Sequence, residues 1–188
     1  MAQPYTKNAI REEFIRQLNE KPLSKITVKS IVDECQINRN TFYYHYSDVY
    51  EVLEEIFEEE LSKGVKEYND TSSWEEAFLR SSNFAFENRK AINHIYHSIQ
   101  REQLERYLYS IAGDVMNRYV NRINENIGAD KEDVEIIAYF YQCALTQMVL
   151  KWIEKGIQDN AEELIRKTGK IFDGNIEMML KKRKSGNS

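Results

Sequence analysis

The chain has 188 residues and a formal net charge of −5, with 41% hydrophobic and 30% charged residues, proportions that are ordinary for a soluble globular protein. Only 7 Gly and 2 Pro are present, and so few turn residues favour long helices over many short strands. Because the sequence contains neither a secretory signal nor an apolar run of membrane-spanning length, we expect a cytoplasmic protein in which Cys35 and Cys143 are reduced and packed.

The charge is unevenly distributed along the chain. Residues 1–46 contain seven basic and five acidic residues, an excess of +2, whereas the remainder has 19 basic and 26 acidic residues, an excess of −7. A modestly basic N-terminal segment on an acidic body is compatible with contact to nucleic acid, but an excess of two charges is weak support for it.

A helix is predicted near the N-terminus. Ile10, Phe14 and Leu18 recur at every fourth position and therefore lie on one face of this helix. Thr6 can cap its start, and the helix should end at Lys21–Pro22 because proline disfavours the helical conformation of the residue before it.

Two short helices should follow in close succession. Thr27 is a good N-cap for the first of them, which carries the apolar Ile31 and ends at Gln36. Asn38 can then cap the second, which runs from Arg39 to about Tyr46.

The rest of the chain is also predicted to be helical, which makes the fold all-α. A fourth helix begins after Ser47 or Asp48, and its outer face is acidic, which suits solvent and would repel phosphate. The acidic residues of that face are Glu51, Glu54, Glu55, Glu58 and Glu59. After a polar stretch at Tyr68–Ser73, the body is predicted to form helices at about Trp74–Asn88, Ala91–Ile99, Gln103–Ile127, Lys131–Lys155 and Ala161–Arg183.

The segment 27–46 fits a helix-turn-helix, which needs a positioning helix, a tight turn and a recognition helix that can enter the major groove. The side chains expected on the outer part of the recognition helix suit DNA. Arg39 can grip guanine with its planar guanidinium, and Asn40 can pair with the edge of adenine. The hydroxyls and imidazole nearby suit phosphate.

The runs KPLSKITVKSI (21–31) and INRNTFYYHY (37–46) resemble the N-terminal signature of the TetR/AcrR family of transcriptional regulators. The resemblance implies a homodimer that reads a palindromic operator as a repressor and is released by a small-molecule effector. It also implies eight DNA-contacting residues, namely Thr27, Lys29, Arg39, Asn40, Thr41, Tyr43, Tyr44 and His45. Tyr46, at the family's usual Phe position, is expected to pack beneath the recognition helix.

Two positions depart from the family pattern. Gln36 stands where most members have Gly in the turn, and at positive φ it would cost about 1 kcal/mol relative to Gly. Val49 stands where the family usually has Lys at the start of the fourth helix, which removes one expected phosphate contact. Both changes weaken the expectation of tight DNA binding without breaking the scaffold.

The expected organisation is a DNA-binding domain at residues 1–47 and a helical regulatory and dimerisation domain at residues 48–188. The helix predicted at Lys131–Lys155 has apolar residues on more than one face, so a single subunit cannot easily bury all of them. We therefore expect a homodimer through the last two predicted helices, which is also where TetR-like proteins usually dimerise.

Aromatic residues in the body are either core or the lining of an effector pocket. The candidates for the pocket are Phe84, Tyr96, Tyr107, Tyr119, Tyr139 and Phe140. His94 and His97 stand three apart but lack a further metal ligand at matching spacing, so neither a metal nor a cofactor is expected.

The chain is not expected to be an enzyme, since it has no Gly-rich phosphate loop, no nucleophile elbow and no zinc-binding His-Glu-x-x-His. A second possibility stays open, in which the chain keeps the fold and binds a protein partner in place of DNA. Salt-dependent duplex binding that requires Arg39 and Tyr43 would distinguish the two.

Overall fold

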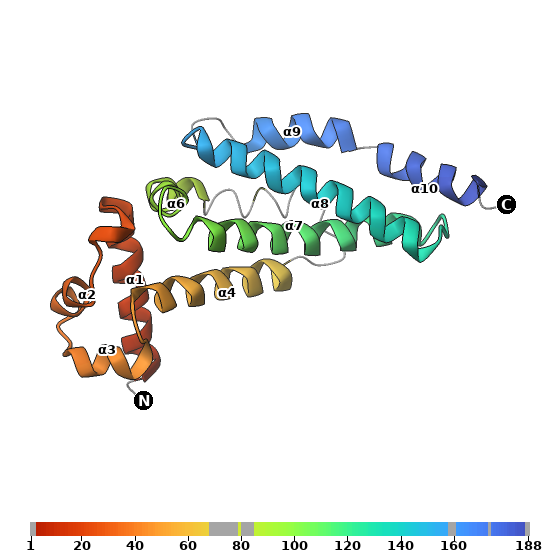
Figure 1. The fold of residues 1–188 in the computed structure, drawn as a ribbon. Coiled ribbons are helices and arrows are strands. Elements are labelled where there is room, and N and C mark those ends of the chain that lie inside the picture. The colour runs from red at the N-terminus through yellow and green to blue at the C-terminus, as the bar shows by residue number, and fades with distance from the viewer. Residues whose placement is uncertain (1–2, 68–78, 80–84, 158–160, 173, 187–188) are drawn as a thin grey trace. The chain divides into compact units, whose positions relative to one another are not determined.

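The computed structural model describes residues 3–67, 79, 85–157, 161–172 and 174–186 (Figure 1). Helices make up every regular element of these residues, which confirms the all-α prediction. Within them, no helix is long and apolar enough to cross a membrane. The chain divides into two compact units, one made of residues 1–62 with 88–104 and the other of residues 63–87 with 105–188. Each unit is described separately below.

Five α-helices and one turn of 3-10 helix build the N-terminal unit. They are α1 (Gln3–Glu20), η1 (Leu23–Lys25), α2 (Val28–Glu34), α3 (Arg39–His45), α4 (Val49–Glu67), of which residues 49–62 belong to this unit, and α6 (Arg89–Tyr96). The prediction that Thr6 caps the first helix is wrong, because α1 already includes Gln3 and Thr6 lies within it.

The apolar stripe of α1 forms the centre of this unit. Ile10 and Phe14 are fully buried and Leu18 is 2% exposed, as their spacing predicts. Further apolar side chains close the core around them, namely Leu23, Ile26, Ile31, Val32, Phe42, Val49, Val52, Leu53 and Ile56. Because α2 and α3 are only seven residues each, they depend on tertiary packing, which α2 makes with α1 and α3 makes with α2.

The start of α4 is capped as expected. Asp48 Oδ1 accepts hydrogen bonds from the backbone N–H of Tyr50 at 2.7 Å and of Glu51 at 3.0 Å. In return, the Glu51 carboxylate accepts the backbone N–H of Ser47 at 2.5 Å. This reciprocal arrangement satisfies donors that a helix N-terminus otherwise leaves unpaired.

The C-terminal unit contains most of α7 (Arg101–Asn124), followed by α8 (Lys131–Glu154), α9 (Ala161–Phe172) and α10 (Asn175–Gly186). The prediction of a single last helix at Ala161–Arg183 is wrong, because α9 and α10 are separate. Gly174 directly precedes α10 with φ +76°, a left-handed conformation that favours glycine and ends helices. The helix predicted at Trp74–Asn88 lies largely outside the described residues.

Within this unit, α8 packs against helices on two sides. On one side, the buried Gln142 donates a hydrogen bond from Nε2 to the Tyr109 carbonyl on α7 at 3.0 Å. On the other side, the ring of Tyr141 meets that of Phe172 edge to face, with centroids 4.6 Å apart. A third face of α8 therefore remains for solvent or a partner.

Candidate DNA-binding site

The turn between α2 and α3 holds Gln36 at φ +54°. Two backbone hydrogen bonds close the end of α2, from Ile37 N–H to the Val32 carbonyl at 3.1 Å and from Gln36 N–H to the Asp33 carbonyl at 3.4 Å. This is the Schellman pattern, which places its αL residue where glycine is preferred. The expectation of a strained glutamine in this turn is therefore confirmed.

Asn38 caps α3 as predicted. Its Oδ1 accepts hydrogen bonds from the backbone N–H of Thr41 at 2.8 Å and from the Thr41 hydroxyl at 3.0 Å. On the inner side of α3, Phe42 is fully buried and Tyr46 is 2% exposed, so Tyr46 packs beneath the helix as expected. Burial is also the main reason why the pKa of Tyr46 is raised, and the phenol stays neutral.

The outer side of α3 presents four of the predicted DNA-contacting residues. Arg39 and Asn40 are exposed in its first turn, and neither side chain has a hydrogen bond or ion pair with another described residue. Tyr43 is 54% exposed and Tyr44 is 71% exposed. A seven-residue helix thus turns a guanidinium, a carboxamide and two phenols outward, which is the chemistry that reads base edges and phosphates.

Three further predicted contact residues differ in how much hydrogen-bonding capacity they retain. The Thr27 hydroxyl oxygen accepts the Ser30 N–H at 3.1 Å, so its own proton remains available for a phosphate oxygen. Thr41 instead donates its hydroxyl proton to Asn38 and cannot also donate it to DNA. The half-buried His45 stacks edge to face with Tyr44, with centroids 5.1 Å apart.

Basic residues of α1 are paired with acidic residues inside the N-terminal unit, which sequence reasoning missed. Lys7 Nζ lies 2.8 Å from Glu55 Oε1, and Arg11 forms an ion pair with Glu59. The expectation that the acidic face of α4 points only to solvent is therefore wrong for Glu55 and Glu59. Lys7 and Arg11 are four residues apart on α1, as Glu55 and Glu59 are on α4, but this spacing does not specify how the two helices meet.

The remaining cations are the ones that can meet phosphate. Lys25, Lys29 and Arg39 are exposed, and none of them has an ion pair with another described residue. Lys29, which belongs to the eight predicted contact residues, lies in the first turn of α2. Val49, in the place of an expected lysine, is 8% exposed and belongs to the core.

The six residues proposed for an effector pocket are not gathered in one described cavity. Phe84 lies outside the described residues, and Tyr96 is buried in the N-terminal unit, where the Arg101 guanidinium lies 4.4 Å from its ring centroid. In the C-terminal unit Tyr107 and Tyr119 are half-buried, whereas Tyr139 and Phe140 are 58% and 59% exposed.

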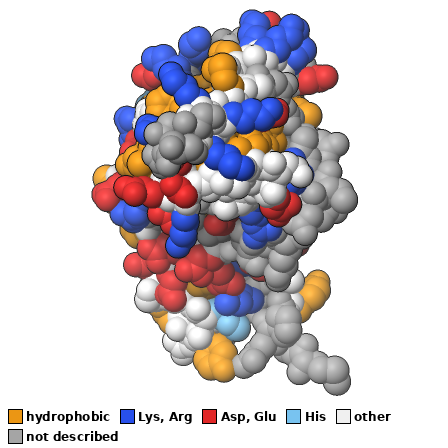
Figure 2. All heavy atoms as spheres, turned by 90° about the vertical axis from the view of Figure 1, so that its right-hand side faces the viewer, with side chains coloured by type: hydrophobic (Ala, Val, Ile, Leu, Met, Phe, Trp, Pro, Cys, Tyr) orange, Lys and Arg blue, Asp and Glu red, His pale blue; other side chains and the backbone are white. Residues whose placement is uncertain are grey.

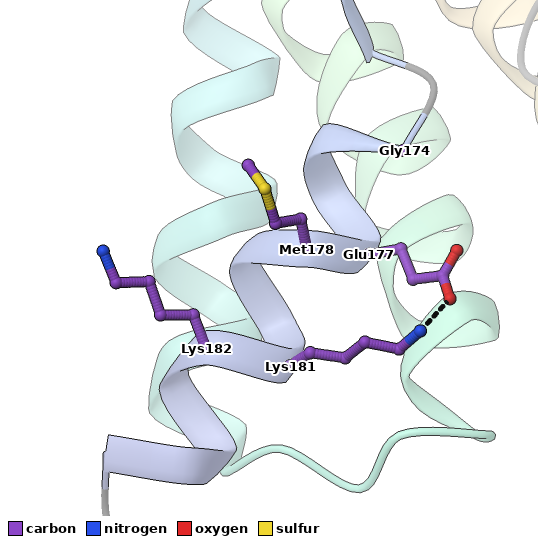
Figure 3. Close-up of a pocket in the computed structure, with 5 residues that line it drawn as sticks. All are labelled: Gly174, Glu177, Met178, Lys181 and Lys182. Carbon is purple, nitrogen blue, oxygen red and sulfur yellow. Dashed lines mark hydrogen bonds and ion pairs between the residues drawn. The ribbon is translucent and has the colours of Figure 1, made fainter.

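A surface depression lies elsewhere, on α10 (Figure 3). It is lined by Gly174, Glu177, Met178, Lys181 and Lys182, and Lys181 Nζ is 2.5 Å from Glu177 Oε1. None of the six candidate pocket residues lines this depression.

His94 in α6 and His97 at the C-terminal end of this helix each contact a backbone carbonyl. His94 Nδ1 lies 2.7 Å from the Leu18 carbonyl oxygen, and His97 Nδ1 lies 2.9 Å from that of Asn93. The part of the chain that the structure describes contains no group of three or more side chains able to hold a metal ion.

A helix-turn-helix with an exposed recognition helix, followed by a helical body, defines the architecture of a transcriptional regulator. Residues 72–174, more than half of the chain, match the family model described as the transcriptional regulator C-terminal region of the TetR type. The chain belongs to the TetR family of transcriptional regulators, and it is not an enzyme.

Comparison with solved structures supports the same fold. The dihydroxyacetone kinase operon activator DhaS is similar to this chain, with a TM-score of 0.77 and 18% sequence identity. The similarity covers 92% of this chain and 97% of DhaS. No curated protein sequence matches the chain.

Proposed function

We propose that this regulator is a homodimer that binds a palindromic operator through α2 and α3, represses transcription there, and is released by a small-molecule effector. The observation that carries the proposal is the outer face of α3. There the side chains of Arg39 and Asn40 are exposed and have no hydrogen bond or ion pair with another described residue. Arg39 suits the O6 and N7 atoms of guanine, and Asn40 suits the N6 and N7 atoms of adenine.

The flanking residues supply contacts to the DNA backbone. Lys29 and the Thr27 hydroxyl offer donors at the start of α2, and Tyr43 and Tyr44 offer phenolic hydroxyls on α3. Such contacts fix the register of a protein on the duplex, whereas base contacts select the sequence. We assign Thr41 a role in the α3 cap, because its hydroxyl already donates to Asn38.

The second copy of the chain is proposed to cover the outward face of α8. Ile136, Tyr139 and Phe140 are 53%, 58% and 59% exposed there, and Ile171 and Met178 of the neighbouring α9 and α10 are 60% and 59% exposed. Figure 2 shows hydrophobic side chains at the surface among Lys and Arg side chains in its upper part, where the C-terminal helices lie. An apolar face of this kind favours burial against a copy of itself. Tyr139 and Phe140 are better suited to this interface than to an effector pocket.

Release by an effector requires that it bind the two states of the dimer unequally. Operator binding needs the two recognition helices about 34–36 Å apart, and an effector that favours another spacing weakens DNA binding by its differential affinity. The half-buried Tyr107 and Tyr119 are the remaining candidates in the C-terminal unit for contact with that effector.

One observation favours a different function, in which the chain binds a protein partner and not DNA. Lys7, Arg11 and Arg16 are all engaged in ion pairs within the N-terminal unit, which leaves few cations for phosphate.

Whether the regulator represses or activates transcription is a separate question. DhaS is described as an operon activator, whereas we assign repression here because occlusion of a promoter requires nothing beyond operator binding.

Selection of bound sequences from a random duplex library tests the proposal. The wild-type dimer should enrich a palindrome, and the double variant Arg39→Ala/Tyr43→Ala should enrich nothing. The matched control is Arg166→Ala, which removes an exposed arginine of α9 and should enrich the same palindrome as wild type. Absence of enrichment at low salt, with the protein folded and dimeric, would overturn operator binding and favour the protein-partner function. A promoter reporter carrying the palindrome then separates repression from activation.

A further inference from the structure

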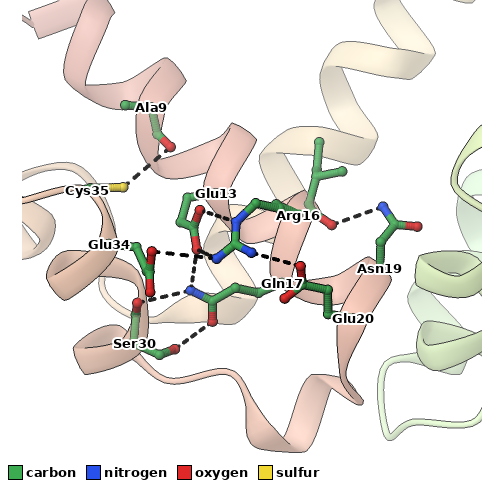
Figure 4. A network of polar contacts seen from close by, with 10 residues as sticks. Ala9, Glu13, Arg16, Gln17, Asn19, Glu20, Ser30, Glu34 and Cys35 are labelled. Carbon is green, nitrogen blue, oxygen red and sulfur yellow. Dashed lines mark hydrogen bonds and ion pairs between the residues drawn. The ribbon is translucent and has the colours of Figure 1, made fainter.

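Gln17 is a buried polar residue of α1 whose side-chain nitrogen and oxygen are both hydrogen-bonded. It is 2% exposed, and it lies among the apolar residues of the α1 core face. Its Nε2 donates to Glu13 Oε1 at 2.6 Å and to the Ser30 backbone carbonyl at 3.0 Å, while its Oε1 lies 2.7 Å from the Ser30 hydroxyl and accepts its proton (Figure 4). The Ser30 hydroxyl also lies 2.9 Å from the Thr27 carbonyl oxygen, so its one proton is shared between two acceptors. A buried amide whose nitrogen and oxygen are both hydrogen-bonded holds its partners in one geometry.

Ser30, the partner of Gln17, belongs to the N-terminal cap of α2. Its hydroxyl oxygen accepts the backbone N–H of Thr27 at 3.1 Å, and its backbone N–H donates to the Thr27 hydroxyl at 3.1 Å. Gln17 is thus joined through one residue to the first turn of α2. That turn carries Thr27 and Lys29, which offer donors to the DNA backbone.

The other side of Gln17 is also fixed. Arg16 holds the Glu13 carboxylate with two hydrogen bonds of 2.7 Å, and this arginine is the main cause of a lowered pKa of Glu13. At the far end of α2, the Cys35 thiol lies 3.5 Å from the Ala9 carbonyl of α1 (Figure 4). The short helix α2 is therefore tied to α1 near both of its ends.

From these contacts we infer that Gln17 is a positioning residue for DNA binding, which sets the place of Thr27 and Lys29 against the phosphate backbone through Ser30. The inference rests on the proposed operator binding. A binding site must be held within about 0.5 Å of its productive geometry, and such precision comes from supporting hydrogen bonds. For stability alone an apolar side chain would serve at this position, because burying an amide gains little even when its hydrogen bonds are made.

The test compares Gln17→Met, which keeps the size of the side chain, with Ser30→Ala and with the double variant. Each is measured on the selected palindrome and on a scrambled duplex of equal length, over a range of salt concentrations. The control is Ile10→Val, which weakens the same core without touching Ser30 and should leave DNA affinity unchanged while the protein is folded.

We expect Gln17→Met to lose affinity about tenfold on both duplexes, because phosphate contacts carry no sequence information. The slope of log K against log salt should become shallower by about 2 for a dimer that loses one phosphate contact per protomer. Ser30→Ala removes this link and also the cap bond to the Thr27 N–H, so it should lose at least as much, and the double variant should be no worse than Ser30→Ala alone. A loss of stability alone would not change the salt slope.

Two outcomes separate the inference from the function on which it rests. If wild type and Gln17→Met bind both duplexes with the same affinity and salt slope, the inference is overturned and operator binding stands. If wild type binds no duplex at low salt, operator binding itself is overturned and the inference with it. Should Gln17→Met fail to fold, Ser30→Ala still gives the overturning result, because it removes the link to Gln17 together with the cap bond to the Thr27 N–H, and an unchanged affinity and salt slope would leave that link without a role.

Discussion

Arg11 on α1 and Glu59 on α4 form a two-pronged ion pair, in which the guanidinium side chain is only 13% exposed and the carboxylate side chain is 43% exposed. The second acidic neighbour of Arg11 is Glu55, at 4.0 Å. The pair joins the first and fourth helices of the N-terminal unit, 48 residues apart in sequence. Water can therefore solvate the Glu59 carboxylate but has little access to the Arg11 guanidinium.

Removal of Glu59 should destabilise the protein more than removal of Arg11. Glu59→Ala leaves a largely buried guanidinium without its main partner and should lower the free energy of unfolding by about 2 kcal/mol. Arg11→Met leaves a carboxylate that water can solvate, and should cost less than about 1 kcal/mol. Urea unfolding monitored by circular dichroism measures both. Glu58→Ala, on the exposed side of α4, is the matched control and should cost almost nothing. Equal losses for the two variants would contradict the argument.

Replacement of the turn residue Gln36 by glycine should stabilise the protein. Its φ of +54° is strained for a residue with a Cβ atom, so Gln36→Gly should raise the free energy of unfolding by about 1 kcal/mol. The same replacement at Gln3, which begins α1, should not stabilise, since glycine disfavours helices. Thermal or urea unfolding measures the change. An unstable Gln36→Gly protein would show that the glutamine side chain makes a contribution larger than the backbone strain.

Glu13 should make the stability depend on pH in the acid range. Its pKa is lowered in the folded protein, chiefly by the hydrogen bonds from Arg16, so folding favours the ionised carboxylate. This stabilisation is fully present above the unfolded pKa of about 4.3 and is lost as pH falls through the lower folded value. Urea unfolding between pH 6 and pH 3 should therefore show a steeper loss for wild type than for Glu13→Gln. Parallel curves for the two proteins would rule out this role of Glu13.

The caps and core of the helix-turn-helix could be predicted from the sequence because they depend on neighbours in the chain. Thr27 and Asn38 find their partners three residues away, and the stripe containing Phe14 repeats every four residues. The pairing of Arg11 with Glu59 depends on how two distant helices meet, which local patterns do not specify. The separation of α9 from α10 at Gly174 was missed because a glycine within an otherwise helical pattern is also tolerated in helices.

The outward face of α8 should determine the oligomeric state. Ile136→Asp places a charge on the proposed interface, where its desolvation opposes association, and should give a monomer by light scattering at micromolar concentration. Ile99→Asp is the matched control, because Ile99 is 82% exposed in the N-terminal unit and its replacement should leave the dimer intact. A dimeric Ile136→Asp protein would place the interface elsewhere, and a monomeric wild type would remove the proposed dimer altogether.

Two lysines of the N-terminal unit should contribute unequally to DNA binding although both lie near the helix-turn-helix. Lys29 is exposed and has no ion pair with another described residue, so it releases counterions when it meets a phosphate. Lys7 already has Glu55 as its partner at 2.8 Å, and its contact with DNA would require that pair to break. Lys29→Ala should therefore reduce the slope of log K against log salt by about 2 for a dimer, with an equal loss of affinity on specific and scrambled duplexes. Lys7→Ala should leave that slope nearly unchanged, because Lys7 is held by Glu55 and makes no phosphate contact. Fluorescence anisotropy across a salt series measures both variants, and equal slopes for the two would show that ion pairing within the unit does not decide which cations reach the DNA.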